Sequence, residues 1–313
     1  MRNLYFSLLL VVGVVLLAGC GSREPTPYVR LQVEAPAEVA GEELAPGKLP
    51  LRVAVAAVLS PEATFEVYGP LLEALSQALD RPVELLQRST YAEINELIRT
   101  GAADIAFICG GAFVEGEHGN YMELLVAPKV EGEVTYRSLV LVPADSPAQS
   151  LEDLRGKRFA FTDPLSNSGR LYITYWLRQR GESPDTFFKE TIFTYSHDNS
   201  VRAVADGIVD GAAVDSLVYS YLSKEEPELA RRTRVLHSSP DFGIPPVVVH
   251  PDLDPVLKAQ LRQALVNMNR TSQGRAALRA LHVDGFTVVS PTLYDDIRTM
   301  AAALRGWTVS QGN

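Results

Sequence analysis

From residue 51 onward, short apolar runs alternate with segments whose leucines repeat at helical spacing. The first run, "LRVAVAAVL", is typical of a strand buried on both faces, and "PLLEALSQALDRPV" follows with leucines three and four residues apart. "VELLQR", "TYAEINELIRTG" and "ADIAFIC" continue as strand, helix and strand. This order is the signature of a parallel sheet with helices on its faces, so we predict an α/β protein.

The same alternation returns in the second half of the chain. Five further apolar runs have the character of strands, at 138–143, 158–162, 191–195, 210–215 and 245–251. Three helical patterns close the chain, at 257–269, 273–281 and 293–304. We predict two lobes, 50–137 with 245–313 and 138–244, each a mainly parallel sheet flanked by helices. Two crossover strands, "YRSLVLVP" and "PPVVVHP", would join them.

The N-terminal segment "MRNLYFSLLLVVGVVLLAGC" (1–20) has the pattern of a secretory signal. Its apolar run is shorter than the roughly 20 residues of a membrane span. The ending Leu17-Ala18-Gly19-Cys20 resembles the bacterial lipobox, which implies cleavage before Cys20 and a lipid on its sulfur; the alternative is an uncleaved anchor helix. Residues 21–49, rich in Ala, Pro and Glu, are predicted to be a flexible tether. Both alternatives place the protein outside the cytoplasm and attached to a membrane.

Several function classes leave no signal in this chain. The net charge of −9 argues against a nucleic-acid-binding face. The five histidines form no H-x-x-x-H or H-E-x-x-H pair, and neither a nucleophile elbow nor a phosphate-binding P-loop motif is present. Cys109 closes a predicted buried strand and is interpreted as a small packed residue. We therefore predict no enzymatic activity, no metal and no cofactor.

One strand-to-helix junction carries more polar groups than a helix needs. "FAFTDPLSNSG" (159–169) places two serines, an asparagine and a glycine where a helix is expected to begin. A helix N-terminus offers free backbone N–H groups and the positive end of the helix dipole, which together can hold an anion. The alternative is an ordinary N-cap, by Ser166 or Ser168, after an Asp-Pro turn.

Three longer segments resemble one family. "YAEINELIRTGAADIAF", "YRSLVLVPADSPAQSLEDLRGKRFAFTDPLSNSG" and "YSHDNSVRAVADGIVDGAAVD" are similar to the PhnD family of ABC-transporter binding proteins for phosphonate, phosphite or phosphate. The resemblance spans roughly residues 50 to 300. It implies the two-lobe fold of type II periplasmic binding proteins, with the ligand in the cleft between the lobes. It also implies ABC permease and ATPase subunits as partners, and a monomer.

The resemblance implies a set of ligand-binding residues. Ser166, Asn167 and Ser168 correspond to the hydroxyl-rich loop that holds the phosphorus oxyanion, with Asn167 in place of a hydroxyl residue. His197 corresponds to the histidine that follows a later strand, and its ordinary pKa near ~6.5 would let it sense protonation. Tyr91 and Tyr136 correspond to tyrosines of the first lobe and the hinge. For His197 and the tyrosines the alternatives are a turn residue and ordinary packing.

The sequence also departs from relatives that bind aminoalkylphosphonates. Those relatives carry two acids for the ligand's ammonium, where this chain has Leu217 and an isoleucine or proline of "FGIPPVVV". Asp215 lies close by and could substitute, or could cap the segment that follows. The ligand is therefore expected to be a phosphonate, phosphite or phosphate-like anion without an ammonium. A sulfonate, another organic anion or a cofactor precursor, and a role as a sensory subunit, remain the alternatives.

Overall fold

The structure, a computed structural model, describes residues 49–306 of the 313. Contacts within the chain separate Met1–Gly47 from a compact unit, Lys48–Asn313. The predicted signal segment, its lipidation site Cys20 and the tether up to residue 48 lie outside the described residues. Within the described part, no helix is both long and apolar enough to cross a membrane.

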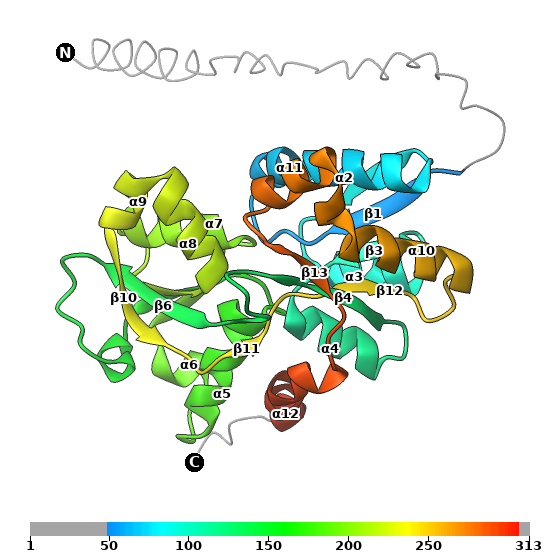
Figure 1. The fold of residues 1–313 in the computed structure, drawn as a ribbon. Coiled ribbons are helices and arrows are strands. Elements are labelled where there is room, and N and C mark those ends of the chain that lie inside the picture. The colour runs from blue at the N-terminus through cyan, green and yellow to red at the C-terminus, as the bar shows by residue number, and fades with distance from the viewer. Residues whose placement is uncertain (1–48, 307–313) are drawn as a thin grey trace, which may run out of the picture. The chain divides into compact units, whose positions relative to one another are not determined.

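Six strands form the first sheet, in the order β13–β4–β12–β3–β1–β2 (Figure 1). They are β1 (Leu51–Val55), β2 (Val83–Gln87), β3 (Ile105–Phe107), β4 (Glu123–Lys129), β12 (Val247–Val249) and β13 (Gly285–Thr287). The helices of this part are α2 (Pro61–Leu79), α3 (Tyr91–Arg99), α4 (Gly110–His118), α10 (Pro255–Val266) and α11 (Ser272–Ala280). We call this sheet with these helices the first lobe.

Five strands form the second sheet, in the order β10–β6–β9–β7–β8. They are β6 (Ser138–Pro143), β7 (Arg158–Phe161), β8 (Glu190–Phe193), β9 (Gly211–Asp215) and β10 (Thr233–Ser238). The helices of this part are α5 (Tyr172–Arg178), α6 (Pro184–Phe187), α7 (His197–Ala205), α8 (Ser216–Glu225) and α9 (Pro227–Arg231). We call this sheet with these helices the second lobe.

Both sheets are mixed in direction. The predicted parallel order holds for β2–β1–β3 and for β8–β7–β9. The remaining pairs, which involve β4, β6, β10, β12 and β13, are antiparallel. An apolar run predicts a strand but not its direction, which depends on the end of the sheet from which the chain enters.

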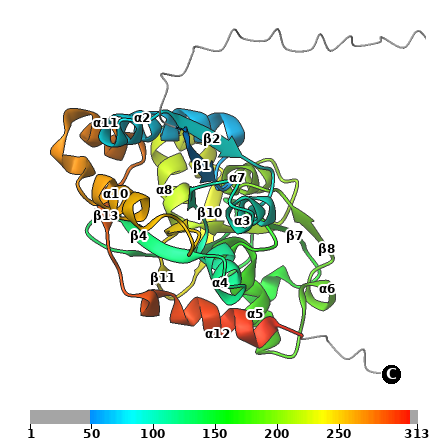
Figure 2. The same ribbon diagram turned by 90° about the vertical axis from the view of Figure 1, so that its right-hand side faces the viewer.

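The two lobes meet at a short ribbon and a shared helix. Strands β5 (Thr135–Tyr136) and β11 (Phe242–Gly243) pair antiparallel where the chain passes between the sheets. Helix α12 (Asp295–Leu304) contacts both α4 and α5, and Figure 2 shows it running alongside them. One hydrophobic cluster runs through this region and includes buried side chains of both lobes.

Some elements were not expected from the sequence. Helix α4 reads "GGAFVEGEH", in which three glycines mask the helical pattern, and α8 directly follows a strand without a separating turn signal. The helix that was expected to begin in the polar loop at 159–169 begins instead with a π-helical turn, Asn167–Leu171, before α5. Such turns widen the helix locally and are frequent at functional sites.

Candidate functional site

Buried polar side chains from both lobes gather between the two sheets. The seven residues singled out from the sequence are all at most 3% exposed: Tyr91, Tyr136, Ser166, Asn167, Ser168, His197 and Asp215. Cys109, at the end of β3, lies among them. In sheets of this kind the ends of the strands form a crevice in which ligands bind. Apart from Tyr136 in β5, these residues lie at or just after the ends of β2, β3, β7, β8 and β9.

Most of these residues stand at the beginning of a helix. Tyr91 is the first residue of α3, and His197 is the first residue of α7. Cys109 and Asp215 are the N-cap residues of α4 and α8. Ser166 is the N-cap of the π-helical turn that leads into α5. Five helical segments therefore direct the positive ends of their dipoles toward one buried region.

Asp163 anchors the polar loop to the first lobe. Its Oδ2 accepts a hydrogen bond from the backbone N–H of Tyr91 (3.1 Å), and its Oδ1 accepts one from Leu165 N–H (2.8 Å). Burial raises the pKa of this carboxyl group, and the two backbone donors partly offset that effect. The loop and the start of α3 are thus joined across the boundary between the lobes.

Ser166 acts as a helix cap. Its Oγ accepts the backbone N–H of Gly169 at 2.9 Å. A Cβ atom on Gly169 would lie 2.5 Å from Thr162 Cβ, so only glycine fits against β7 here. The capping alternative therefore describes the acceptor role of the Ser166 hydroxyl correctly, and the same hydroxyl also interacts with the Cys109 thiol.

The other two loop residues turn polar atoms into the buried region. Asn167 donates its backbone N–H to Cys109 Sγ (3.2 Å) and its Nδ2–H to the Tyr136 hydroxyl (3.0 Å). Asn167 Oδ1, Ser168 Oγ and the Tyr91 hydroxyl are buried without a hydrogen-bond partner among the described residues. Ser168 lies close enough to Tyr136 for an electrostatic interaction, but its Oγ does not reach hydrogen-bond geometry.

Unpaired buried atoms of this kind cost free energy. Each orphaned donor or acceptor costs about 1–3 kcal/mol. A ligand that satisfies them recovers this cost. Exchanging the two ends of the Asn167 amide would keep the Tyr136 contact, since a hydroxyl both donates and accepts. The amide can therefore present either a donor or an acceptor to a ligand.

His197 is held as a neutral ring. Its Nδ1 accepts the backbone N–H of Asp215 (3.0 Å) and lies 3.1 Å from Thr162 Oγ1. Burial lowers its pKa to about 3. The expectation that this histidine senses protonation near pH 6.5 is therefore wrong, because desolvation keeps the ring uncharged there. With Nδ1 accepting, the ring proton sits on Nε2.

Asp215 is the titratable group near neutrality. Its Oδ1 accepts the backbone N–H of Leu217 at 2.7 Å, which caps α8. Burial raises its pKa to about 7, and the backbone donors of Leu217 and Val218 limit the rise. Near an anion this carboxyl group would favour its protonated form, which can donate a hydrogen bond.

No cationic side chain shares this buried region. None of the described lysines and arginines is buried. The described residues also contain no group of three or more His, Cys, Asp or Glu side chains placed to hold a metal ion. Positive potential comes here from helix N-termini and neutral donors, together with the half-buried Arg170, which acts electrostatically on Asp163.

Comparison with known proteins identifies the family. Residues 53–294 match the family described as "ABC transporter, phosphonate, periplasmic substrate-binding protein", which is more than half of the chain. The chain belongs to this family. Membership of a periplasmic family implies a location outside the cytoplasm.

Two proteins named for phosphonate binding or phosphate import are similar in sequence to this chain. The chain is 26% identical over 239 residues to the phosphonates-binding periplasmic protein of Escherichia coli K12, which covers 75% of this chain and 70% of the relative. It is 36% identical over 162 residues to the phosphate-import protein PhnD of Mycolicibacterium smegmatis, which covers 48% of this chain and 50% of the relative.

Solved structures show the same fold. A binding protein of an ABC phosphonate transporter from Pseudomonas aeruginosa superposes with a TM-score of 0.77 at 25% identity, covering 82% of this chain and 86% of that one. PhnD1 of Prochlorococcus marinus, in complex with methylphosphonate, superposes with a TM-score of 0.75 at 20% identity, covering 82% and 98%. These likenesses establish the type II periplasmic-binding-protein fold for this member of the phosphonate-binding family.

The contacts of two site residues were not predicted. Cys109 was interpreted as a packed residue, although the resemblance places it where members of the family often carry a polar or aromatic cleft residue; its thiol accepts a hydrogen bond from the opposite lobe. Asp163 was seen only as part of a turn, yet it bridges the lobes through Tyr91 N–H. Both roles depend on how closely the lobes approach each other. The sequence signal available for Asp163 was its place at the end of a strand, before the polar loop.

Proposed function

We propose that this protein is the solute-binding component of an ABC importer and captures a phosphorus oxyanion, such as a phosphonate, phosphite or phosphate, between its lobes. One observation carries the proposal. Five helix N-termini and three unpaired polar atoms meet in a buried region without a lysine or arginine. An oxyanion with several acceptor oxygens fits such a set of donors.

Each residue has a distinct part in the proposed site. The Tyr91 hydroxyl, Ser168 Oγ and the His197 Nε2 proton donate to the anion. Asn167 contributes its amide, which the Tyr136 hydroxyl orients. Ser166 shapes the loop as its cap, and Asp215 donates when it is protonated.

The protein binds without chemical transformation in this proposal. Binding energy would favour the state in which the lobes are closed on the anion. The lobes span 50–137 with 245–313 and 138–244. Cys20 would carry the lipid that anchors the protein to the membrane. The protein itself would be a monomer, and its partners would be an ABC permease and ATPase.

A thermal-shift screen tests the ligand class. The chain from Lys48 on forms one compact unit and contains three clusters of buried hydrophobic side chains, so this part of the chain is used for the screen. Its melting temperature should rise with methylphosphonate, phosphite or phosphate, because a ligand that binds only the folded state stabilises it. Ser168→Ala should reduce the rise. The matched control Ser272→Ala, on α11, should not. The absence of a shift with every phosphorus oxyanion would refute the proposed ligand class.

A further inference from the structure

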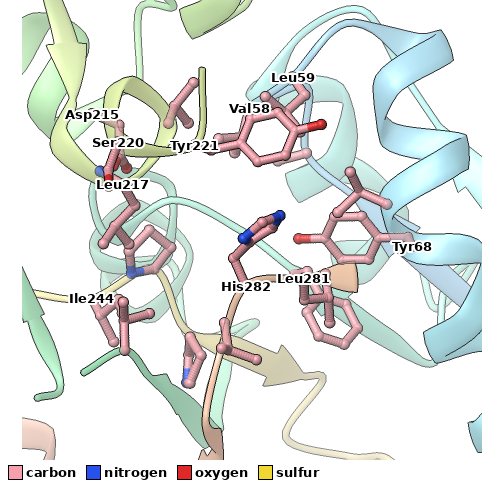
Figure 3. Close-up of a pocket in the computed structure, with 18 of the residues that line it drawn as sticks. Val58, Leu59, Tyr68, Asp215, Leu217, Ser220, Tyr221, Ile244, Leu281 and His282 are labelled. Atoms are coloured by element: carbon pink, nitrogen blue, oxygen red, sulfur yellow. The ribbon is translucent and has the colours of Figure 1, made fainter. Parts of the chain in front are cut away.

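A second, apolar chamber lies between the lobes beside the polar site (Figure 3). Its volume is about 180 Å³. The first lobe contributes side chains of α2, of the chain segment before β12 and of the loop before β13. The second lobe contributes the first turns of α8. Figure 3 shows Leu217 and Ile244 on one side of the chamber and Tyr68 on the other.

The chamber adjoins the polar site. Asp215 lines the chamber and also interacts with Tyr91 and Tyr136 in the polar site. Val58 lines it too, and its carbonyl accepts the backbone N–H of His197 at 3.0 Å. Ile108 lines it next to Cys109 in sequence. The two regions therefore share a wall made by Asp215 and by neighbours of His197 and Cys109.

The chemistry of the chamber changes from its inside to its rim. The inner wall consists mainly of aliphatic, aromatic and proline side chains, including Leu217, Ile244 and Phe286. Exposed polar residues line it as well, among them Glu131, Ser220 and Lys224. His282 of the first lobe packs edge-on against Tyr221 of α8, with ring centroids 5.2 Å apart. This contact spans the two lobes beside the chamber.

The size of the chamber defines the group that would fit. An apolar protein cavity of about 150 Å³ is large enough to hold benzene. The chamber here is somewhat larger, at about 180 Å³. Methylphosphonate, phosphite and phosphate carry nothing that would fill it. An apolar substituent of phenyl or butyl size would be removed from water there and would contact both lobes.

We propose that the chamber takes the organic substituent of the ligand, so that this protein selects phosphonates with an apolar group of about phenyl size. The inference rests on the proposed function, since the phosphonate head must occupy the polar site. Head and substituent would then each be held by both lobes.

Isothermal titration calorimetry on the chain from Lys48 on tests this inference with methyl-, butyl- and phenylphosphonate. Burial of each added methylene should tighten binding about fourfold, which gives about 60-fold from methyl to butyl. Equal or weaker binding of butyl- and phenylphosphonate beside measurable binding of methylphosphonate would overturn the inference and leave the proposed function standing. Failure of all three to bind would overturn the inference, and it would overturn the proposed function as well only if phosphite and phosphate also fail to bind.

Variants locate the substituent. Leu217→Trp fills the chamber from the second lobe and should bring the ratio of butyl- to methylphosphonate affinity toward one. Val283→Trp does the same from the first lobe and serves if the first variant does not fold. The control Ile208→Trp, at a site 55% exposed in the second lobe, should keep the wild-type ratio. An unchanged ratio of butyl- to methylphosphonate affinity in a folded chamber variant would contradict the placement of the substituent in the chamber. The phosphonate series on the wild type tests the inference even if neither variant folds.

Discussion

The backbone N–H of Asp215 donates a hydrogen bond of 3.0 Å to Nδ1 of His197. This bond fixes the ring tautomer, because a nitrogen that accepts from a backbone amide carries no proton in the neutral ring. It also ties the end of β9 to the beginning of α7. The pKa shifts of the two residues have opposite directions, and each shift favours the neutral form of its side chain in the buried region.

Replacing His197 should weaken anion binding. His197→Ala removes the proposed Nε2 donor, and a hydrogen bond to a charged group contributes about 1.5–3 kcal/mol, so the affinity should fall about 10- to 100-fold. His197→Gln retains a donor and should lose less. Calorimetry with methylphosphonate at pH 6 and 8 checks this. Because the pKa of His197 is about 3, its own titration should add no pH dependence in that interval. Unchanged affinity in His197→Ala would rule out the donor role.

Asp215→Asn should change how stability depends on pH. The pKa of Asp215 is about 7 in the folded protein, against 3.8 for an ordinary aspartate. The folded state therefore holds a proton that the unfolded state has released, and stability falls as pH rises from about 4 to about 7. The difference between the two pKa values corresponds to a loss of folding stability of roughly 4 kcal/mol at most. Asparagine caps helices well and carries no charge.

Chemical denaturation at pH 4 and pH 8 measures this effect. The variant Asp215→Asn should gain stability relative to wild type between pH 4 and pH 8: the difference in the free energy of unfolding, variant minus wild type, should be larger at pH 8 by up to that amount. Asp145→Asn, at an exposed turn position, provides the control and should show no such difference. The same relative stability at both pH values would show that Asp215 is ionised in the fold already.

Gly111→Ala should prevent the lobes from closing. An added Cβ atom at this position of α4 would lie 2.2 Å from the carbonyl oxygen of Leu165 in the second lobe. Each lobe can fold without this contact, so the melting temperature without ligand should change little while methylphosphonate affinity falls at least 10-fold. Gly69→Ala in α2, where an added Cβ atom meets nothing within 4 Å beyond its chain neighbours, should bind normally. Normal binding by Gly111→Ala would mean that the bound state does not use this lobe contact.

Cys109 reports on opening of the lobes. It is the only thiol in the chain from Lys48 on, it is buried, and burial raises its pKa. Labelling by a thiol reagent should therefore require separation of the lobes around Asn167. Ligand at 100 times its dissociation constant should slow labelling by about 100-fold, since the open state must first release it. Cys109→Ser supplies the blank, and a rate independent of methylphosphonate would exclude closure over the ligand.

The sequence predicted the parts of this site that are encoded locally. The polar loop at 163–169, His197 and Tyr91 each stand where a strand pattern gives way to a helical one, and the structure brings them together. The contacts between the lobes could not be predicted from the sequence, because Cys109 and Asp163 gain their partners only when two distant segments meet. The pKa of His197 was also missed, since it depends on complete burial.

A crystal structure of the protein with methylphosphonate tests the central claim most directly. The account predicts phosphonate oxygens within about 3.2 Å of the Tyr91 hydroxyl and Ser168 Oγ, with the His197 Nε2 proton directed at a third contact. It further predicts that the methyl group faces the chamber beside Leu217. Phosphonate bound elsewhere on the protein, with Tyr91 and Ser168 still unpaired, would contradict the account.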